Sequence, residues 1–265
     1  MSLFKKDVFG RSYFIKKWVI RIIGFLSYRR FKGINSLEIT GTKNLKGLPN
    51  NNVLFISNHQ TYFADATAII HVINASLKGR TDSINNIGYI WSPMLNLYFI
   101  AAKETMNDGL LPKILSYAGS IPIERTWRSK GQNLKRPVNE DNIKSIDLAL
   151  EDGWVITFPQ GTTTPFKPIR KGTAHIIKKY KPIVIPIVID GFRRSFDKKG
   201  IRIKKRNILQ SMEIKKPIEI DYDKESIDSI VKKIEYAIEQ HPSFLKVLSE
   251  KELLDLEKSN KQREW

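Results

Sequence analysis

The chain has 265 residues, with 45 Lys and Arg against 27 Asp and Glu, so its formal net charge is +18. It has no cysteine, which excludes disulfides, thiolate nucleophiles and cysteine-ligated metal centres. Apolar runs stay shorter than the ~18 residues of a membrane-spanning helix. The positive charge indicates an anionic partner: nucleic acid, an anionic membrane surface or an acidic carrier protein.

The positive charge is concentrated in two short segments. Residues 1–32 carry nine Lys and Arg against one acidic residue, and residues 193–216 carry ten against two. The other 209 residues are almost neutral. Two basic patches therefore belong to a nearly neutral body.

Large apolar residues are interleaved with the cations of the first patch. Phe14, Trp18, Ile22 and Phe25 follow helical spacing and form one stripe. The flanking cations are Lys16, Lys17 and Arg21. Aromatic residues and cations on one long helix suit the boundary between lipid headgroups and acyl chains. We expect residues 1–33 to be an amphipathic membrane-binding helical segment. A helix packed on the core with a solvated basic face is the alternative.

The remaining elements alternate between strands and helices. Short apolar runs predict strands at 36–40, 52–57, 97–102, 120–123, 154–158 and 183–189. Helical spacing predicts helices at 64–77, 110–117, 139–150, 173–179, 228–239 and 243–258. Residues 87–91 are interpreted as a strand with a helix as alternative, residues 201–221 as a pair of strands, and residues 126–137 as a mobile loop.

This order predicts an α/β fold with a central, mostly parallel or mixed sheet flanked by helices. We expect the α/β domain to span residues 34–240 and a C-terminal helical tail to span residues 241–265.

One histidine stands at a position suited to chemistry. His59 follows the apolar strand at 52–57, and Asp65 comes six residues later. A histidine can take a proton from a hydroxyl near neutral pH, and a carboxylate can hold its ring in one tautomer. The other histidines are interpreted as structural or surface residues; they are His71, His175 and His241.

A second pattern follows the strand at 154–158. The segment Phe158-Pro159-Gln160-Gly161-Thr162 ends a strand in a turn rich in hydroxyls and backbone N–H groups. Such a turn can bind an anion or an oxyanion. Each of the two patterns is a weak signal when taken alone.

With two further segments, and in this order, the patterns resemble the glycerolipid acyltransferase family, typified by 1-acylglycerol-3-phosphate O-acyltransferase. Its four blocks correspond here to Asn58-His59 with Asp65, Gly119 to Arg125, Phe158 to Thr162, and the proline-containing strand 184–188. Lys171-Gly172 stands where the family often has a Lys-Gly before a helix. The resemblance covers about residues 35–220.

The resemblance implies a membrane-associated enzyme that moves a fatty acyl group from acyl-CoA or acyl-carrier protein to a lyso-lipid hydroxyl, above all that of 1-acylglycerol-3-phosphate, in phospholipid biosynthesis. His59 would be the base and Asp65 its partner. The substrate-binding residues would be Asn58, Arg125, Gln160, Gly161, Thr162 and Lys171.

The same resemblance sets the expected partners. They are a lyso-lipid acceptor, the acyl donor as co-substrate and an anionic membrane surface. We expect no cofactor, no metal and no nucleic acid. The expected location is the cytoplasmic face of the membrane, with peripheral or monotopic attachment.

Three departures from the family pattern keep alternatives open. Five residues separate His59 from Asp65 where the family usually has four, so the two can meet only if residues 60–64 form a loop or a bulge at a helix start. Gln160 replaces a Glu, and Thr163 replaces an Arg that often follows the Gly-Thr. The acceptor could therefore be a non-phosphate lyso-lipid such as a lyso-aminolipid.

Two further alternatives give the chain no enzymatic activity. One is a lipid-binding relative that has lost catalysis, suggested by the lengthened His–Asp spacing. The other is a basic nucleic-acid-binding protein, suggested by the net charge and by aromatic residues among the cations.

Overall fold

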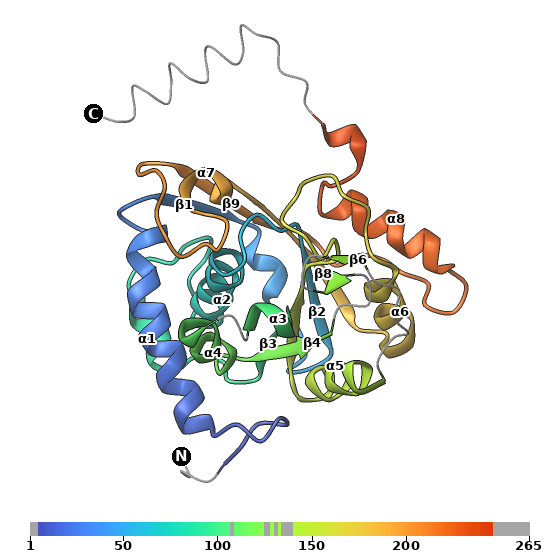
Figure 1. The fold of residues 1–265 in the computed structure, drawn as a ribbon, viewed down its shortest axis with the longest axis horizontal. Helices are drawn as coiled ribbons and strands as arrows, with labels where there is room; N and C mark the ends of the chain where they lie inside the picture. The colour runs from blue at the N-terminus through green and yellow to red at the C-terminus, as the bar shows by residue number, and fades with distance from the viewer. Residues whose placement is uncertain (1–4, 107–108, 125–127, 130–131, 134–139, 246–265) are drawn as a thin grey trace, which may run out of the picture.

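The computed structural model describes residues 5–106, 109–124, 128–129, 132–133 and 140–245. Within them, one seven-stranded sheet has the order β1-β9-β8-β2-β7-β3-β4 (Figure 1). Its strands are β1 Ser36–Thr40, β2 Val53–Ser57, β3 Leu97–Ala102, β4 Ser120–Ile123, β7 Trp154–Thr157, β8 Ile183–Asp190 and β9 Leu209–Ile214. The β8–β9 pair is antiparallel and the other neighbouring pairs are parallel. A separate short pair joins β5 Arg128–Ser129 to β6 Gln132–Asn133.

Helices cover both faces of this sheet (Figure 1). One face carries α1 Tyr13–Phe31, α2 Ala64–Leu77, α3 Lys103–Met106 and α4 Leu110–Ser116, and the other carries α5 Glu140–Asp152, α6 Lys171–Tyr180 and α8 Ile227–Ala237. The remaining helical segments are α7 Phe192–Ser195 and the 3₁₀ turns η1 Thr42–Leu45, η2 Ile87–Trp91 and η3 Pro242–Phe244. Each face has its own apolar core. The predicted α/β fold with a mostly parallel sheet is confirmed.

The burial of each strand matches the pattern of apolar residues in its sequence. Every residue of β2 is buried, because helices cover the central strands on both faces. In β9, by contrast, Gln210, Met212 and Ile214 are buried and the residues between them are exposed. The sheet is thus fully covered at its centre and open on one face toward β9.

Two predicted elements differ from the structure. Residues 87–91 form the 3₁₀ helix η2, which agrees with the helical alternative and not with the strand, because Asn86 adopts a left-handed φ of 58° and its side chain accepts a hydrogen bond from Gly88 N at 3.1 Å. Residues 201–221 form no strand pair, because β9 bonds to β8 and β1 instead. The predicted loop 126–137 and the predicted helix 243–258 lie largely outside the described residues.

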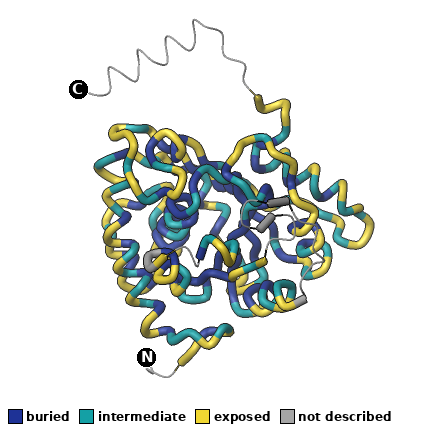
Figure 2. The backbone as a smooth tube through the Cα atoms, in the orientation of Figure 1, coloured by how far each residue is buried: buried dark blue, intermediate teal, exposed yellow. Residues whose placement is uncertain are grey.

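Helix α1 turns its apolar stripe away from the body (Figure 2). Phe14, Trp18, Ile22 and Phe25 are between 44% and 67% exposed. The residues buried against the body are Tyr13, Lys16, Ile20, Gly24, Ser27 and Phe31. The predicted stripe therefore does not pack on the core. None of the described helices combines the length and the apolar character needed to cross a bilayer.

Lys16 does not flank the stripe as expected, because it belongs to the buried face of α1. Its Nζ lies 3.3 Å from Asp7 Oδ2 and 4.1 Å from the ring centroid of Tyr98. Burial, helped by the Arg11 charge, lowers the pKa of Lys16 to about 8 against the opposing effect of Asp7. Asp7 also pairs with Arg11 at 2.8 Å, so one buried carboxylate compensates two cations.

We expect Asp7→Asn to lower the free energy of unfolding by about 3 kcal/mol, because it leaves the Lys16 ammonium buried without a counter-charge. Urea unfolding measures the loss. The double variant Asp7→Asn/Lys16→Met should regain most of it, since a thioether of similar length needs no counter-charge. An unchanged unfolding midpoint in the single variant would show that the pair does not hold α1 in place.

Candidate active site

Three loops meet at one edge of the sheet. Strands β8, β2 and β7 are neighbours and run parallel, so their carboxyl ends lie side by side. The loop after β2 carries His59, the loop after β7 carries Phe158 to Thr164, and α7 follows β8. The carboxyl edge of a parallel sheet is where α/β proteins place their ligands. This edge is the candidate site.

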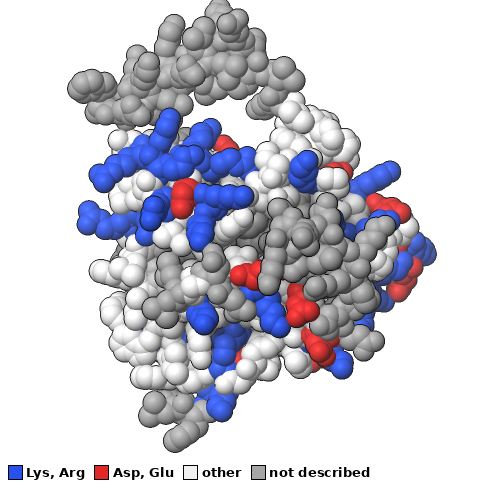
Figure 3. All heavy atoms as spheres, in the orientation of Figure 1, with Lys and Arg blue, Asp and Glu red and all other residues white. Residues whose placement is uncertain are grey.

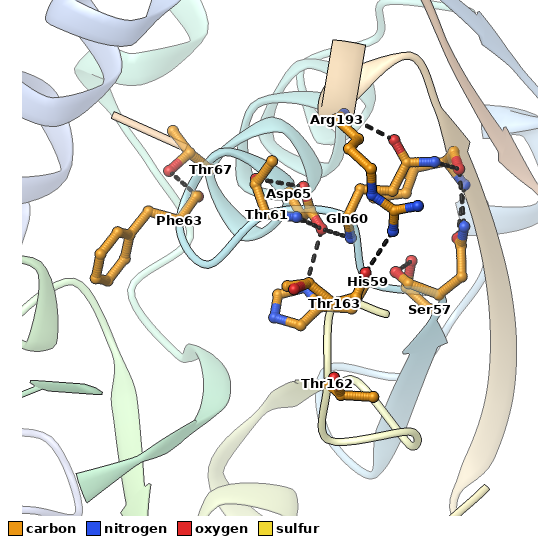
Figure 4. A network of polar contacts seen from close by, with 12 residues as sticks. Ser57, His59, Gln60, Thr61, Phe63, Asp65, Thr67, Thr162, Thr163 and Arg193 are labelled. Atoms are coloured by element: carbon orange, nitrogen blue, oxygen red, sulfur yellow. Dashed lines mark hydrogen bonds and ion pairs between the residues drawn. The ribbon is translucent and has the colours of Figure 1, made fainter. Parts of the chain in front are cut away.

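The structure brings His59 and Asp65 together. His59 Nδ1 lies 2.9 Å from Asp65 Oδ2 (Figure 4). Because α2 begins at Ala64, residues 60–63 are not helical and the chain can fold back on itself. The extra residue between the two is therefore accommodated by a loop, which is one of the two geometries that the spacing allowed.

The Asp65 carboxylate also accepts hydrogen bonds from Gln60 and Thr61 in this loop. The backbone N–H groups of Gln60 and Thr61 donate to Oδ2 at 2.5 and 2.9 Å, and the Thr61 hydroxyl donates to Oδ1 at 2.6 Å. Asp65 also lies in the first turn of α2, where the helix dipole favours a negative charge. These contacts support an ionised carboxylate although its side chain is fully buried.

An ionised carboxylate only accepts hydrogen bonds, so the His59 hydrogen is on Nδ1. The lone pair is then on Nε2, which makes this nitrogen the basic one. The ring also stacks on Phe158, with ring centroids 4.0 Å apart. Asp65 and Phe158 together fix the direction in which His59 can accept a proton.

His59 lies in the wall of a cavity of about 580 Å³. Gly161 and Thr162 line the cavity beside it. Most of the exposed lining is apolar, and strand β3 and helices α5 and α6 contribute to it through Phe99, Ile100, Ile143, Ile146 and Ile176. The cavity thus combines the His59–Asp65 pair and a hydroxyl-bearing turn with a long apolar wall.

Three of the other predicted site residues do not line this cavity; they are Asn58, Gln160 and Lys171. The Asn58 amide exchanges two hydrogen bonds of 2.8 Å with the backbone of Ile189, which extends the β2–β8 ladder by one step. Gln160 is 1% exposed and donates to Lys167 O at 2.8 Å. Lys171 pairs with Asp228 at 2.7 Å. Arg125 lies outside the described residues.

Two side chains that the sequence did not single out connect the loops. The Gln60 amide donates to Ile189 O at 3.2 Å and accepts from Arg193 N at 3.0 Å. The Arg193 guanidinium donates to Thr163 O in the loop after β7 (Figure 4). Neither residue has a sequence signal, because each acts through contacts with groups that are distant in sequence.

The three remaining histidines have different surroundings. His71 is buried between Ser27 Oγ at 2.8 Å and Tyr89 OH at 2.6 Å, and burial lowers its pKa to about 4. His241 stacks on Tyr236 with centroids 4.1 Å apart. His175 is exposed but lines the cavity, which its helical pattern did not indicate.

Comparison with known proteins relates the sequence and the fold to acyltransferases. A family model described as Acyltransferase matches residues 36–190. The fold is similar to the crystal structure of the 1-acyl-sn-glycerophosphate (LPA) acyltransferase PlsC from Thermotoga maritima, with a TM-score of 0.53 and 18% sequence identity over 88% of this chain and 82% of that chain. No curated protein matches the sequence.

We expect Asp65→Asn to destabilise the fold by about 2 kcal/mol. An amide has one acceptor oxygen, and its NH₂ group would face N–H donors that the carboxylate now satisfies. Thermal or urea unfolding measures the loss, and His59→Ala is the comparison, because removing the partly exposed ring leaves the other Asp65 bonds in place. Equal stability of Asp65→Asn and the wild type would mean that the carboxylate does not organise the loop.

Proposed function

This chain belongs to the acyltransferase family, and we propose that it moves a fatty acyl group from acyl-CoA or acyl-carrier protein to the hydroxyl of a membrane lyso-lipid. One observation carries the proposal. A histidine base, oriented by a buried carboxylate, lies in the wall of a mostly apolar cavity. This arrangement suits substrates that join a reacting oxygen to a long apolar chain.

In the proposed reaction the acceptor hydroxyl donates a hydrogen bond to His59 Nε2. Its oxygen attacks the thioester carbonyl carbon while the proton passes to Nε2, and the Asp65 carboxylate stabilises the imidazolium. The tetrahedral intermediate then expels the thiolate, which takes the proton from His59. The new ester forms as the C–S bond breaks, without an acyl-enzyme, in agreement with the absence of cysteine.

The turn after β7 supports the developing charge in this proposal. Gly161 has a left-handed φ of 63°, which favours glycine, and it lines the cavity with Thr162 beside His59. Backbone N–H groups and hydroxyls in such turns stabilise oxyanions. Arg125 is proposed, from the resemblance, as the ligand of an acceptor phosphate.

The acceptor is proposed to be 1-acylglycerol-3-phosphate, and a non-phosphate lyso-lipid such as a lyso-aminolipid is the second candidate. Two observations favour the second candidate, because both remove a cation that could bind a phosphate. Thr163 replaces a family arginine, and Lys171 already pairs with Asp228. A screen of purified protein with one labelled acyl donor distinguishes them. Lysophosphatidate and non-phosphate lyso-lipids are compared by kcat/KM.

We propose that α1 holds the enzyme peripherally on the cytoplasmic face of the membrane. Its exposed stripe offers aromatic and aliphatic side chains to the acyl boundary, and Trp91 beside it is 62% exposed. Arg21 lies over the rings of Trp18 and Trp91, at 5.0 and 5.1 Å. Cations beside such a stripe are attracted to anionic lipids.

His59→Ala is expected to lower kcat for acyl transfer by at least about 10² while leaving the unfolding midpoint near the wild-type value. Transfer of a labelled acyl group to the acceptor found in the screen measures the effect. Circular dichroism provides the control for folding. Wild-type turnover in this variant would remove His59 from the role of base. Absence of turnover in the wild type itself would favour a relative that binds lipid without catalysis.

The double variant Phe25→Ser/Leu26→Ser should bind vesicles of anionic phospholipid at least about tenfold more weakly, because each apolar side chain withdrawn from the bilayer costs on the order of 1.5–3 kcal/mol. Both residues are 67% exposed, so folding should be unaffected. Cosedimentation measures binding. The control is Leu148→Ser, because Leu148 is an exposed apolar residue on a different helix, α5. Unchanged cosedimentation would exclude α1 as the membrane contact.

A further inference from the structure

A second charged surface lies next to the candidate site, and we call it the basic platform. It consists of the cations between residues 193 and 206, and Figure 3 shows Lys and Arg side chains gathered over the end of the molecule where α7 and β9 lie. Its members are Arg193, Arg194, Lys198, Lys199, Arg202, Lys204, Lys205 and Arg206, with Asp197 as the one acidic residue of the segment. The segment therefore has a net charge of +7.

The basic platform is bonded directly to the loop that carries the base. Tyr62 N donates to Lys198 O at 3.1 Å, and Phe63 N donates to Lys199 O at 3.0 Å. Gly200 packs so closely that a Cβ there would lie 2.6 Å from Ala64 N. A partner held on this surface is therefore held beside His59.

The backbone of the platform is fixed by its own hydrogen bonds. Its cations are exposed, although Arg193, Arg194 and Lys204 also bond to neighbouring groups. Asp197 Oδ1 accepts from Ile201 N at 2.8 Å and from Arg202 N at 3.0 Å, so its carboxylate closes the turn. The side chains of Arg202, Lys205 and Arg206 are exposed. The surface offers a rigid array of positive charge with its acidic residue turned to its own backbone.

The platform lacks the apolar side chains that a bilayer contact would use. Between residues 197 and 206 the apolar residues are Ile201 and Ile203, and both pack against the core. Helix α1, by contrast, exposes a whole apolar stripe. A purely cationic, exposed array spread over the surface suits the broad acidic face of a soluble protein more than a bilayer or a compact nucleotide.

We propose that the basic platform docks the acidic face of an acyl-carrier protein, so that the carrier's thioester arm enters the cavity beside His59. This inference rests on the proposed function and deepens it by assigning the donor. Docking through exposed charges raises the rate of encounter more than it lengthens the lifetime of the complex. The donor can then leave after each transfer.

The test compares two donors that carry the same acyl chain, acyl-CoA and acyl-carrier protein, with the full-length chain and one acceptor in micelles. Arg202→Glu/Lys205→Glu/Arg206→Glu reverses the platform. Lys43→Glu/Lys224→Glu/Lys232→Glu is the control, with the same change in net charge at exposed positions of other elements. We expect kcat/KM for the carrier donor to fall by at least about tenfold in the platform variant alone, and acyl-CoA use to stay within about twofold.

Two results with the platform variant would overturn the docking. One is an equal loss with both donors. The other is unchanged use of the carrier, which together with a loss of binding to anionic vesicles would make the platform a membrane contact. Wild-type transfer from acyl-CoA but never from the carrier would also refute it. Failure of the wild type to transfer from either donor would instead refute the proposed function.

Discussion

The buried Asp65 carboxylate is the constraint on which the candidate site depends. Taking a carboxylate out of water costs several kcal/mol unless donors replace the lost hydration. Here His59, Gln60 N–H and both donors of Thr61 supply that replacement. They can do so only if the chain turns tightly between the end of β2 and the start of α2. The need to compensate the Asp65 charge therefore determines the conformation of the loop that orients His59.

That loop in turn requires a close-fitting neighbour. Gly200 lies against Thr61 Oγ1 and Ala64 N, where any Cβ would come within 2.7 Å, and its φ of 74° also favours glycine. On the other side, Gln60 and Arg193 link the loop to the ends of β8 and β7. Three strand ends are thereby joined into one unit around His59, which preorganises the base instead of leaving it on a free loop.

Local pattern was enough for much of the fold. Four elements have the predicted bounds, β1, α2, β3 and β4, because each has a clear local pattern of apolar residues that ends at turn residues. The pattern failed where one residue decides the backbone, as at Asn86, and where a strand finds its partners far away in sequence, as β9 does. It also failed for Lys16, since helical spacing cannot show that Asp7 folds back to pair with it.

The site was predictable in its chemistry more than in its contacts. The resemblance assigned His59, Asp65, Gly161 and Thr162 to one site, and the structure brings them together at one edge of the sheet. The same motifs could not show that the side chains of Asn58 and Gln160 bond to backbone away from the cavity. The Asn58 contact depends on the register of β2 against β8, and the Gln160 contact depends on how the loop after β7 folds back on itself.

The concentration of positive charge in two segments has a physical reason if one proposed substrate arrives from the bilayer and the other from water. A lyso-lipid reaches the site from a bilayer, which the apolar stripe of α1 can hold at any salt concentration, because burial of apolar surface is not screened. A water-soluble donor must bind and leave in every cycle. Contacts between exposed charges suit that need, since they are screened within about 8 Å at physiological ionic strength and give speed without a long-lived complex. The platform carries cations alone, which suits brief binding of a soluble donor. Helix α1 carries cations around apolar residues, which suits lasting contact with a bilayer.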